Sequence, residues 1–214
     1  MEISYLGHSS FKIRGKNVTV VLDPFDPKLL GLKFPQVNAD IVTVSHGHPD
    51  HNFLSGVNAE AFIINGPGEY EIKGTSILGL SSFHDDKQGA EKGKNTIYEL
   101  RMDGLSLVHL GDLGHKLTDA MTEALDGVDI LFVPVGGFYT MGLTEVQETI
   151  NQLEPKIIIP MHYRVPGLNA AIAEKLLPLE EFLKAVGKTD IVPLDKLSVT
   201  KDKLTEETQI VVLK

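Results

Sequence analysis

Three histidines and an aspartate lie within six consecutive residues of the 214-residue chain, in the segment His46-Gly-His-Pro-Asp-His51. The segment follows the apolar run Ile41-Val-Thr-Val44, which is typical of a buried strand. Residues two apart in an extended segment point to the same side, so His46 and His48 can present both imidazoles to one point. Imidazole and carboxylate groups at this density predict a metal site.

Pro49 favours the start of a helix, and the sequence predicts one over residues 49–57. Asp50 and His51 are then expected in its first turn. The positive end of the helix dipole favours an ionised Asp50 and a neutral His51, which are the protonation states that metal binding requires. A lone histidine on an apolar face is more often a core residue, but a cluster favours a metal site.

Length and composition predict one domain over residues 1–214. No apolar stretch approaches the ~20 residues that span a bilayer, so no membrane partner is expected. The segment Glu2-Ile-Ser-Tyr-Leu6 gives no signal-peptide pattern, and we expect a cytoplasmic protein. The chain has no cysteine, which excludes disulfides and thiolates and restricts the metal ligands to imidazoles and carboxylates.

The charge balance is acidic, with 29 acidic and 20 basic residues and a net charge of -9. Binding to a nucleic-acid backbone requires clustered Lys and Arg, and the scattered lysines form no such run. We therefore expect a small anionic or polar substrate rather than nucleic acid. The oligomeric state is left open.

Apolar and alternating segments predict strands first, with helices interleaved later in the chain. Strands are expected at residues 2–6, 9–14, 17–22, 41–45, 61–64, 75–80, 96–101, 105–110, 129–134, 157–160 and 208–213. Helices are expected at residues 49–57, 117–125, 144–153 and near 169–186. Hairpin-type turns are expected at Gly15-Lys-Asn17, Lys73-Gly74 and Asp103-Gly104. This order favours an α+β fold with two sheets between helices.

The hexapeptide resembles the HxHxDH signature of the metallo-β-lactamase superfamily, and the resemblance covers nearly the whole chain. Members bring a further His, a bridging Asp and a last His from loops that follow strands. The matching residues are His84 after Thr75-Ser-Ile-Leu-Gly-Leu80, Asp112 in Leu110-Gly-Asp-Leu113 and His162 in Ile157-Ile-Ile-Pro-Met-His162. Tyr5-Leu-Gly-His-Ser-Ser-Phe11 and Gly66-Pro-Gly-Glu-Tyr-Glu-Ile72 look like the small single-domain branch that includes L-ascorbate-6-phosphate lactonase.

The resemblance implies an αββα sandwich of two mixed β-sheets flanked by helices, with two divalent metal ions at one edge. It assigns His46, His48 and His84 to one metal, Asp50, His51 and His162 to the other, and Asp112 to both. An imidazole-rich set favours zinc, with manganese and iron as alternatives. The implied reaction is attack of a metal-activated hydroxide on a small lactone, ester or phosphoester, with Asp50 orienting the hydroxide and taking its proton.

Three alternative functions are a nuclease or phosphodiesterase acting on RNA or DNA, a β-lactamase side activity, and a regulatory scaffold without catalysis. Nuclease members usually carry an inserted nucleic-acid-binding domain or arm, for which this chain has neither room nor basic patches. The complete set of ligand residues argues against the scaffold.

Four other residues are candidates for supporting roles. The resemblance makes Asp23, at a strand end, a carboxylate that orients a ligand histidine; the alternative is a turn residue. His8 follows the first strand and is a candidate contact to a ligand or to substrate. His115 is either a proton donor to the leaving group or an exposed histidine at a helix start. Tyr139 is expected to line the pocket mouth, together with Phe138 and Met141.

The polar loop at residues 85–95 is either a mobile flap or an ordinary surface loop. Its Lys92 and Lys94, with Arg164, are the nearest cations for an anionic substrate. His109 lies in the middle of an expected strand, and we predict a buried, hydrogen-bonded histidine there.

Overall fold

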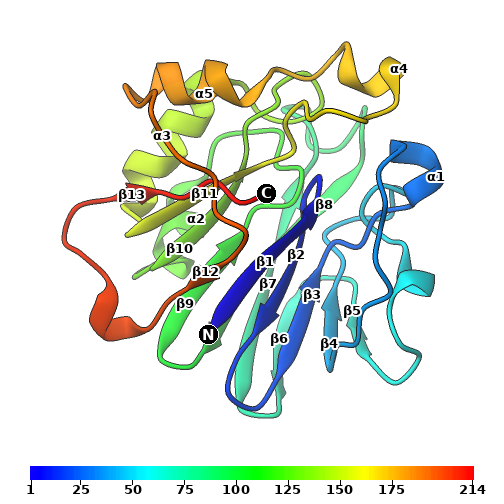
Figure 1. Ribbon diagram of the computed structural model, residues 1–214. Helices are drawn as coiled ribbons and strands as arrows, with labels where there is room; N and C mark the ends of the chain where they lie inside the picture. The colour runs from blue at the N-terminus through cyan, green and yellow to red at the C-terminus, as the bar shows by residue number, and fades with distance from the viewer.

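The computed structural model describes residues 1–214 and contains two β-sheets and five short α-helices (Figure 1). The strands of the first sheet are β1 (Glu2–Gly7), β2 (Ser10–Arg14), β3 (Thr19–Leu22), β4 (Ile41–Thr43), β5 (Phe62–Ile64) and β12 (Leu197–Ser198). Those of the second sheet are β6 (Gly68–Ile72), β7 (Thr75–Phe83), β8 (Lys94–Met102), β9 (Leu105–His109), β10 (Ile130–Pro134), β11 (Ile157–Met161) and β13 (Gln209–Ile210). The helices are α1 (Pro27–Leu30), α2 (Asp119–Ala124), α3 (Leu143–Leu153), α4 (Ala170–Ala173) and α5 (Leu179–Ala185), with 3-10 turns η1 (Leu54–Gly56) and η2 (Lys201–Lys203).

Both sheets are mixed. The first has the order β12-β1-β2-β3-β4-β5 and the second β13-β11-β10-β9-β8-β7-β6. Neighbours from β1 to β3 and from β6 to β9 are antiparallel, whereas β3, β4 and β5 are parallel, as are β9, β10, β11 and β13. The predicted fold class, two mixed sheets flanked by helices, is confirmed.

The predicted strands all overlap strands of the structure, and the three predicted turns join β2 to β3, β6 to β7 and β8 to β9. Two strands were not predicted. Strand β6 alternates exposed charged residues at an edge of its sheet, a pattern of low β-propensity, and β12 is only two residues long.

The helix predicted at residues 49–57 is wrong. The segment forms turns and η1 instead, because its backbone groups bond to the segment that follows β3. The N–H of Phe53 donates to the carbonyl of Pro24 over 2.7 Å, and the carbonyl of Pro49 accepts from Asp26 over 2.9 Å. These tertiary hydrogen bonds replace the helical ones.

The helix predicted near residues 169–186 is divided into α4 and α5. Pro178 separates them because proline lacks a backbone donor and disfavours helix in the preceding residue. The backbone of that residue, Leu177, instead bonds to Gly136 and to Arg164, each over 2.9 Å. None of the helices in the structure has the length and apolar character needed to cross a bilayer.

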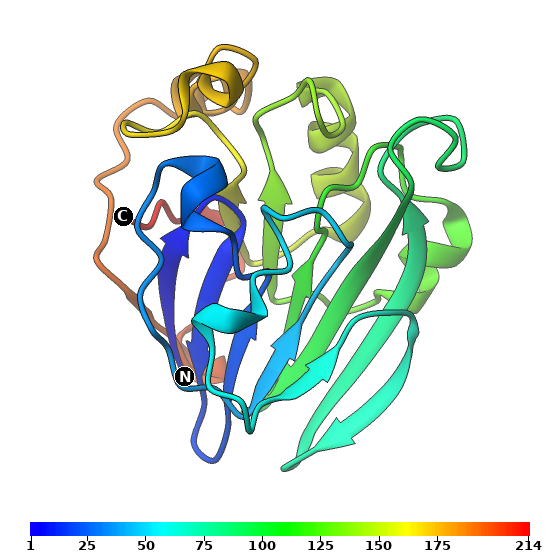
Figure 2. The same ribbon diagram turned by 90° about the vertical axis from the view of Figure 1, so that its right-hand side faces the viewer.

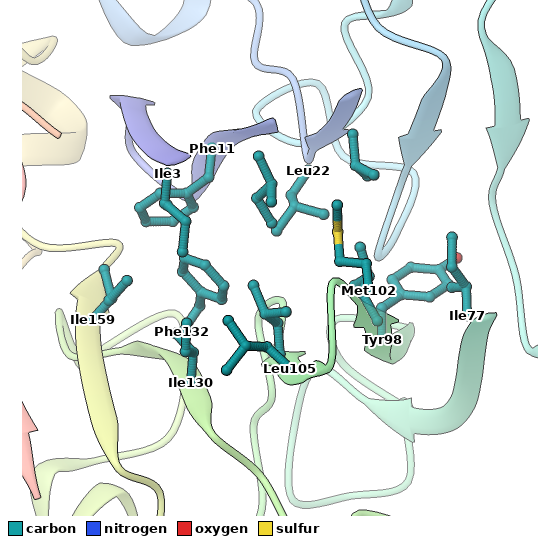
Figure 3. Close-up of a cluster of buried hydrophobic side chains, with 14 of the residues drawn as sticks. Ile3, Phe11, Leu22, Ile77, Tyr98, Met102, Leu105, Ile130, Phe132 and Ile159 are labelled. Atoms are coloured by element: carbon teal, nitrogen blue, oxygen red, sulfur yellow. The ribbon is translucent and has the colours of Figure 1, made fainter. Parts of the chain in front are cut away.

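The main core lies between the two sheets, where aliphatic and aromatic side chains alternate inward along the strands (Figure 3). Ile3, Phe11 and Leu22 of the first sheet face Phe132 and Ile159 of the second, and all five are fully buried. The sheets are thereby held face to face, as the side view in Figure 2 shows.

The outer faces of the two sheets are covered differently. A second core cluster joins the second sheet to α3 and α5 through Val146, Leu153 and Phe182. The first sheet is covered mainly by loop residues such as Val37 and Val57. The helical layer on the first sheet is therefore thinner than the αββα prediction implies, since residues 49–57 form no helix.

The strands that precede the predicted ligands end at one edge of the structure. Strands β9 and β11 run parallel, and β7 runs in the same direction because both it and β9 are antiparallel to β8. At this edge the N–H of His162, after β11, donates to the carbonyl of His8, after β1, over 2.9 Å. This bond ties the second sheet to the first beside the cluster described next.

Candidate metal centre

Loops at this edge bring all seven predicted ligand residues together, and His8 joins them. Ligand atoms within each of three overlapping sets lie within 4.8 Å of one another. The sets are His46, His48 and His84; His46, His51 and Asp112; and His8, Asp50, His51 and His162. We refer to His46, His48 and His84 as the His46 half of the site, and to Asp50, His51 and His162 as the Asp50 half.

Asp112 lies between the two halves. Its Oδ1 is 3.3 Å from Nε2 of His51, and its Oδ2 is 3.2 Å from Nε2 of both His84 and His162. The side chain is almost fully buried. A carboxylate that contacts histidines of both halves occupies the position that a bridging ligand needs.

Unpaired polar atoms concentrate in this cluster. Ten buried side-chain nitrogen and oxygen atoms lack a hydrogen-bond partner, and seven of them lie here. They are Nδ1 and Nε2 of His8, Nε2 of His46 and His51, Nδ1 of His84 and His162, and Oδ1 of Asp112. Buried polar groups are costly unless they are paired, so such a concentration needs a ligand. Imidazoles and carboxylates fit a divalent cation such as zinc, manganese or iron.

His46 and His48 are held neutral. Burial, together with the nearby His51, lowers the pKa of His46 to about 3. Burial and the proximity of His84 lower the pKa of His48. Neutral imidazoles have a free lone pair for a metal ion, as ligation requires.

The carboxylates are held ionised. Burial acts in the opposite direction, but His51 and then His8 keep the pKa of Asp50 below its ordinary value. Although burial opposes it too, His162 and His51 hold the pKa of Asp112 well below the ordinary range. The ionised state that the helix argument predicted for Asp50 therefore arises from neighbouring imidazoles, because no helix begins at Pro49.

The sequence predicted a neutral His51, but the ring lies beside the carboxylates of Asp50 and Asp112, which favour its protonated form. Burial opposes protonation, but Asp112 and Asp50 raise the pKa of His51 well above its ordinary value. A proton on His51 thus offsets the buried negative charge when no cation does so. His51 would have to lose this proton in order to hold a divalent cation through Nε2.

Asp23 holds the ligands from behind. Its Oδ2 accepts a hydrogen bond from Nδ1 of His51 over 2.7 Å, and its Oδ1 accepts the N–H of Ser45 over 2.8 Å. The hydroxyl of Ser45 lies 2.9 Å from Nδ1 of His46. This is the contact that the resemblance implies for Asp23, and it leaves Nε2 of His51 and His46 facing the cluster.

Backbone strain gathers at the same place. Eight non-glycine residues have positive φ, and four of them border the site: His8 (57°), Asp23 (41°), Phe138 (38°) and His162 (55°). Such conformations persist only where the surroundings enforce them, and they cluster at functional sites.

A cavity of about 490 Å³ opens above the cluster, a size suited to a small molecule. Its walls come from α1, α4, the loop at residues 85–95 and the loop that follows β10. The lining residues are His8, Leu29, His48, Pro49, Asp50, His84, Glu91, Lys92, Asp112, Phe138, Tyr139, His162 and Ile172. Tyr139 and Phe138 therefore line the pocket as predicted, whereas Met141 does not.

Residues 2–162 match the family described as the beta-lactamase superfamily domain. A solved structure from Thermotoga maritima, assigned to the Zn-dependent hydrolases of the metallo-β-lactamase superfamily, is 37% identical, with a TM-score of 0.80 over 99% of this chain and 97% of that one. The chain belongs to the metallo-β-lactamase superfamily.

Two relatives of the chain bear the name UPF0173 metal-dependent hydrolase. The protein from Carboxydothermus hydrogenoformans is 28% identical over an alignment 204 residues long that covers 81% of this chain and 90% of that one. The protein from Archaeoglobus fulgidus is 29% identical over an alignment 219 residues long that covers 87% of this chain and 90% of that protein.

Two supporting residues were missed by the sequence analysis. The amide of Asn95 donates to Ser82 Oγ over 2.8 Å and to the carbonyl of Leu110 over 2.9 Å, and its Oδ1 accepts the N–H of Asp112 over 3.0 Å. An isolated asparagine near the start of a strand carries no signal of this role. Ser45 directly precedes the superfamily hexapeptide, and that position is the one available clue.

The structure does not bring His115 to the metallo-β-lactamase site. Its Nδ1–H donates to the carbonyl of Lys116 over 2.7 Å, and its Nε2 accepts the N–H of Phe83 over 3.2 Å. It lines a separate cavity beside Asp85 and Glu145. Both ring nitrogens are engaged, so the geometry gives no support to the predicted role of leaving-group acid.

The loop at residues 85–95 is organised by Asp85. Its carboxylate accepts four backbone N–H groups, from Lys87 (2.9 Å), Gly89 (2.8 Å), Glu91 (3.0 Å) and Lys92 (2.7 Å). These bonds hold the pKa of Asp85 below its ordinary value. The loop is thus folded around one buried carboxylate.

Lys92 links this loop to the loop after β10. Its Nζ donates to the carbonyls of Phe138 over 3.0 Å and Tyr139 over 2.7 Å. Of the three predicted cations, Lys92 lines the cavity above the cluster, and Lys94 and Arg164 do not. The pocket therefore has one lysine, already bonded to protein oxygens.

His109 is a core residue, as predicted. It is fully buried, its Nε2–H donates to the carbonyl of Ser9 over 2.9 Å, and its Nδ1 accepts the N–H of Gly111 over 3.2 Å. With both nitrogens paired, His109 contrasts with the unpaired histidines of the metal centre.

Proposed function

We propose that this enzyme of the metallo-β-lactamase fold hydrolyses a small lactone, ester or phosphoester with two divalent metal ions, of which zinc is the best candidate. The supporting observation is the group of seven unpaired buried atoms at the base of a 490 Å³ cavity. His46, His48 and His84 would hold one ion, Asp50, His51 and His162 the other, and Asp112 both.

When bound, divalent cations lower the pKa of a water molecule and polarise a carbonyl or phosphoryl oxygen. Asp50 is the ligand carboxylate open to the pocket, with 23% of its side chain exposed. The lowered pKa keeps the Asp50 carboxylate ionised. An ionised carboxylate at this point would accept a proton from the attacking water. Asp50 also orients that water by accepting its hydrogen bond.

The remaining residues supply rigidity and exclude bulk water. Asp23 fixes the ring of His51, and Asn95 fixes the backbone of Asp112. Phe138 and Tyr139 form one wall of the cavity. Such supporting contacts keep the reacting groups in place without rearrangement during the reaction.

A small substrate is favoured over RNA or DNA. The cavity is the size of a small-molecule site, and its single lysine is bonded to two carbonyls. The narrower likeness to L-ascorbate-6-phosphate lactonase, a β-lactamase side activity, the cytoplasmic location and the single-domain organisation remain predictions.

The test begins with metal-free protein reconstituted separately with zinc, manganese and iron(II), followed by elemental analysis. Lactone, ester, phosphodiester, β-lactam and RNA substrates are then assayed with and without chelator. We expect close to two ions per chain and chelator-sensitive turnover of a small substrate. The Asp112→Ala variant should lose metal binding and turnover. The His115→Ala variant, altered outside the cluster, should keep metal binding and turnover. Absence of tight metal binding, or turnover of RNA alone, would refute the proposal.

A further inference from the structure

His8 is a member of the cluster that the HxHxDH pattern does not include. Its Nε2 lies 3.4 Å from Oδ2 of Asp50, and its ring centroid lies 4.1 Å from that of His162. Together with His51 these residues form one set of atoms within 4.8 Å of one another. His8 therefore approaches the Asp50 half of the site as closely as the predicted ligands approach one another.

The imidazole of His8 makes no hydrogen bond within the protein. Only 1% of the residue is exposed, and neither ring nitrogen has a hydrogen-bond partner. Each of the other buried histidines of the cluster has one fully buried nitrogen without a hydrogen bond, whereas His8 has two and His109 has none. Burying an imidazole without a hydrogen bond costs free energy, and a bound ligand would offset that cost.

The backbone holds this ring in a strained position. His8 has a φ of 57°, after Gly7 at 120°, and a non-glycine residue rarely adopts this region. The carbonyl of His8 accepts both the N–H of His162, over 2.9 Å, and the hydroxyl of Tyr5, over 3.0 Å. These bonds come from both sheets and fix the turn that aims the imidazole inward.

We propose that His8 is a fourth side-chain ligand, through Nε2, of the metal ion held by Asp50, His51 and His162. The inference rests on the proposed metal binding and extends it. The two halves of the site then differ, since the Asp50 half has four side chains besides Asp112 and the His46 half has three. The first equivalent of metal should load into the Asp50 half.

The test is a titration of metal-free protein with Co²⁺, followed by calorimetry and by proton NMR of the shifted imidazole N–H signals. His8→Asn removes the imidazole and retains a residue that tolerates positive φ. His8→Gly relieves the backbone strain and replaces the first variant if its Tm is lowered. We expect the tighter binding event to weaken about tenfold or more, with one shifted imidazole signal fewer.

His115→Asn is the matched control and should bind Co²⁺ like the unaltered protein. If both His8 variants keep the affinities of both Co²⁺ binding events and the full number of shifted imidazole signals, the proposal is wrong. In that case a raised KM would identify His8 as a substrate contact. If the unaltered protein binds no Co²⁺, the proposed function itself fails, which is a different result.

A second inference concerns the substrate and depends on the cavity wall. Leu29 of α1, Ile172 of α4, Phe138 and Tyr139 form its apolar side. Leu29 is 37% and Phe138 63% exposed, although large apolar side chains are normally covered. The N–H of Asn169, at the start of α4, donates to the carbonyl of Leu30 in α1 over 2.8 Å, which joins the two helices that carry this wall.

The polar side of the cavity has no free cation for an anionic tail. Lys92 is bonded to two carbonyls, and Glu91 adds a negative charge. Lys175 lies over the ring of Phe138, 5.1 Å from its centroid, but does not line the cavity. We infer that the substrate is a neutral ester or lactone whose non-reacting part is apolar, whereas the sequence predicted a small anionic or polar molecule.

The test uses the zinc-reconstituted enzyme and nitrophenyl esters from acetyl to octanoyl, with nitrophenyl phosphate as the anionic comparison. We expect kcat/KM to rise about fourfold per methylene group until the cavity is full, since burial of one contributes roughly 0.8 kcal/mol. Leu29→Ala and Ile172→Ala should flatten this series. Leu54→Ala, whose parent residue is 40% exposed outside the cavity, should leave it unchanged.

Turnover that is independent of chain length, or a preference for the phosphorylated substrate, would overturn the inference. Absence of turnover on every ester and phosphoester would instead count against the proposed function.

Discussion

Asp23 and His51 form a fully buried pair in which the Nδ1–H of the histidine donates to the carboxylate over 2.7 Å. The same carboxylate accepts the N–H of Ser45, whose hydroxyl contacts His46. One aspartate outside the ligand set thus orients a histidine from each half of the site. Nδ1 of His109 lies 3.9 Å from the same carboxylate.

The first prediction concerns Asp23→Asn. The neutral amide cannot hold the His51 ring as a carboxylate does, and we expect metal affinity to fall about 10–100-fold with the fold retained. Competition with a chromophoric chelator measures the affinity. Asp40→Asn, which alters a carboxylate paired with Lys73 away from the site, is the control. An affinity unchanged by Asp23→Asn would mean that the pair has no role in metal binding.

Asp50→Ala should abolish most of the turnover and spare one metal. The variant removes a candidate proton acceptor, a role that contributes about 10²–10⁴-fold, and leaves the His46 half intact. Steady-state kinetics on the true substrate and elemental analysis of the same sample provide the two readouts. Turnover at the level of the unaltered protein would show that the proton goes elsewhere.

The strands and the ligand-bearing loops were predictable from sequence because each is a local pattern. Runs such as Ile41-Val-Thr-Val44 and Ile157-Ile-Ile mark buried strands, and the polar residues that follow them lie at the strand ends. The helix predicted after Pro49 does not form. The N–H of Phe53 donates to the carbonyl of Pro24, which is distant in sequence, and this hydrogen bond outweighs the local preference for a helix. Local rules hold where no tertiary partner competes.

The pocket was not predictable for the same reason. Whether Lys92 faces substrate or the carbonyls of Phe138 and Tyr139 depends on how two loops approach each other. The engagement of both nitrogens of His115 likewise depends on the backbone of Phe83. No spacing along the chain encodes such contacts.

Metal removal should destabilise the protein. Ligands that bind only the folded state stabilise it by about 2.7 kcal/mol at a concentration of 100 Kd. For a chain of 214 residues this corresponds to a fall in Tm of roughly 5–10 °C on chelation. Differential scanning calorimetry with and without EDTA, and after zinc is returned, measures it. A Tm that does not respond to either step would contradict the metal centre.

His109→Ala should lower stability without changing metal content. The change removes two buried hydrogen bonds and leaves the carbonyl of Ser9 unpaired, which costs about 2–3 kcal/mol. Urea denaturation measures the free energy of unfolding, and elemental analysis measures the metal. Loss of turnover with an unchanged unfolding midpoint would make His109 a functional residue instead of a core residue.

The last prediction concerns the bond between the two loops at the pocket mouth. Lys92→Met keeps the length and the apolar stem of the side chain but removes the donor to Phe138 and Tyr139. We expect backbone amides in residues 135–141 to exchange with solvent about fivefold faster, since the lost bonds contribute roughly 1 kcal/mol. Because the same loop carries two wall residues, KM should rise while metal content stays constant. Hydrogen exchange by mass spectrometry measures the exchange rates.

Lys116→Met, which removes a surface ion pair with Glu148, is the control and should change neither the exchange rates nor KM. Exchange rates that match those of the unaltered protein would show that the wall is held by its own packing and not by Lys92.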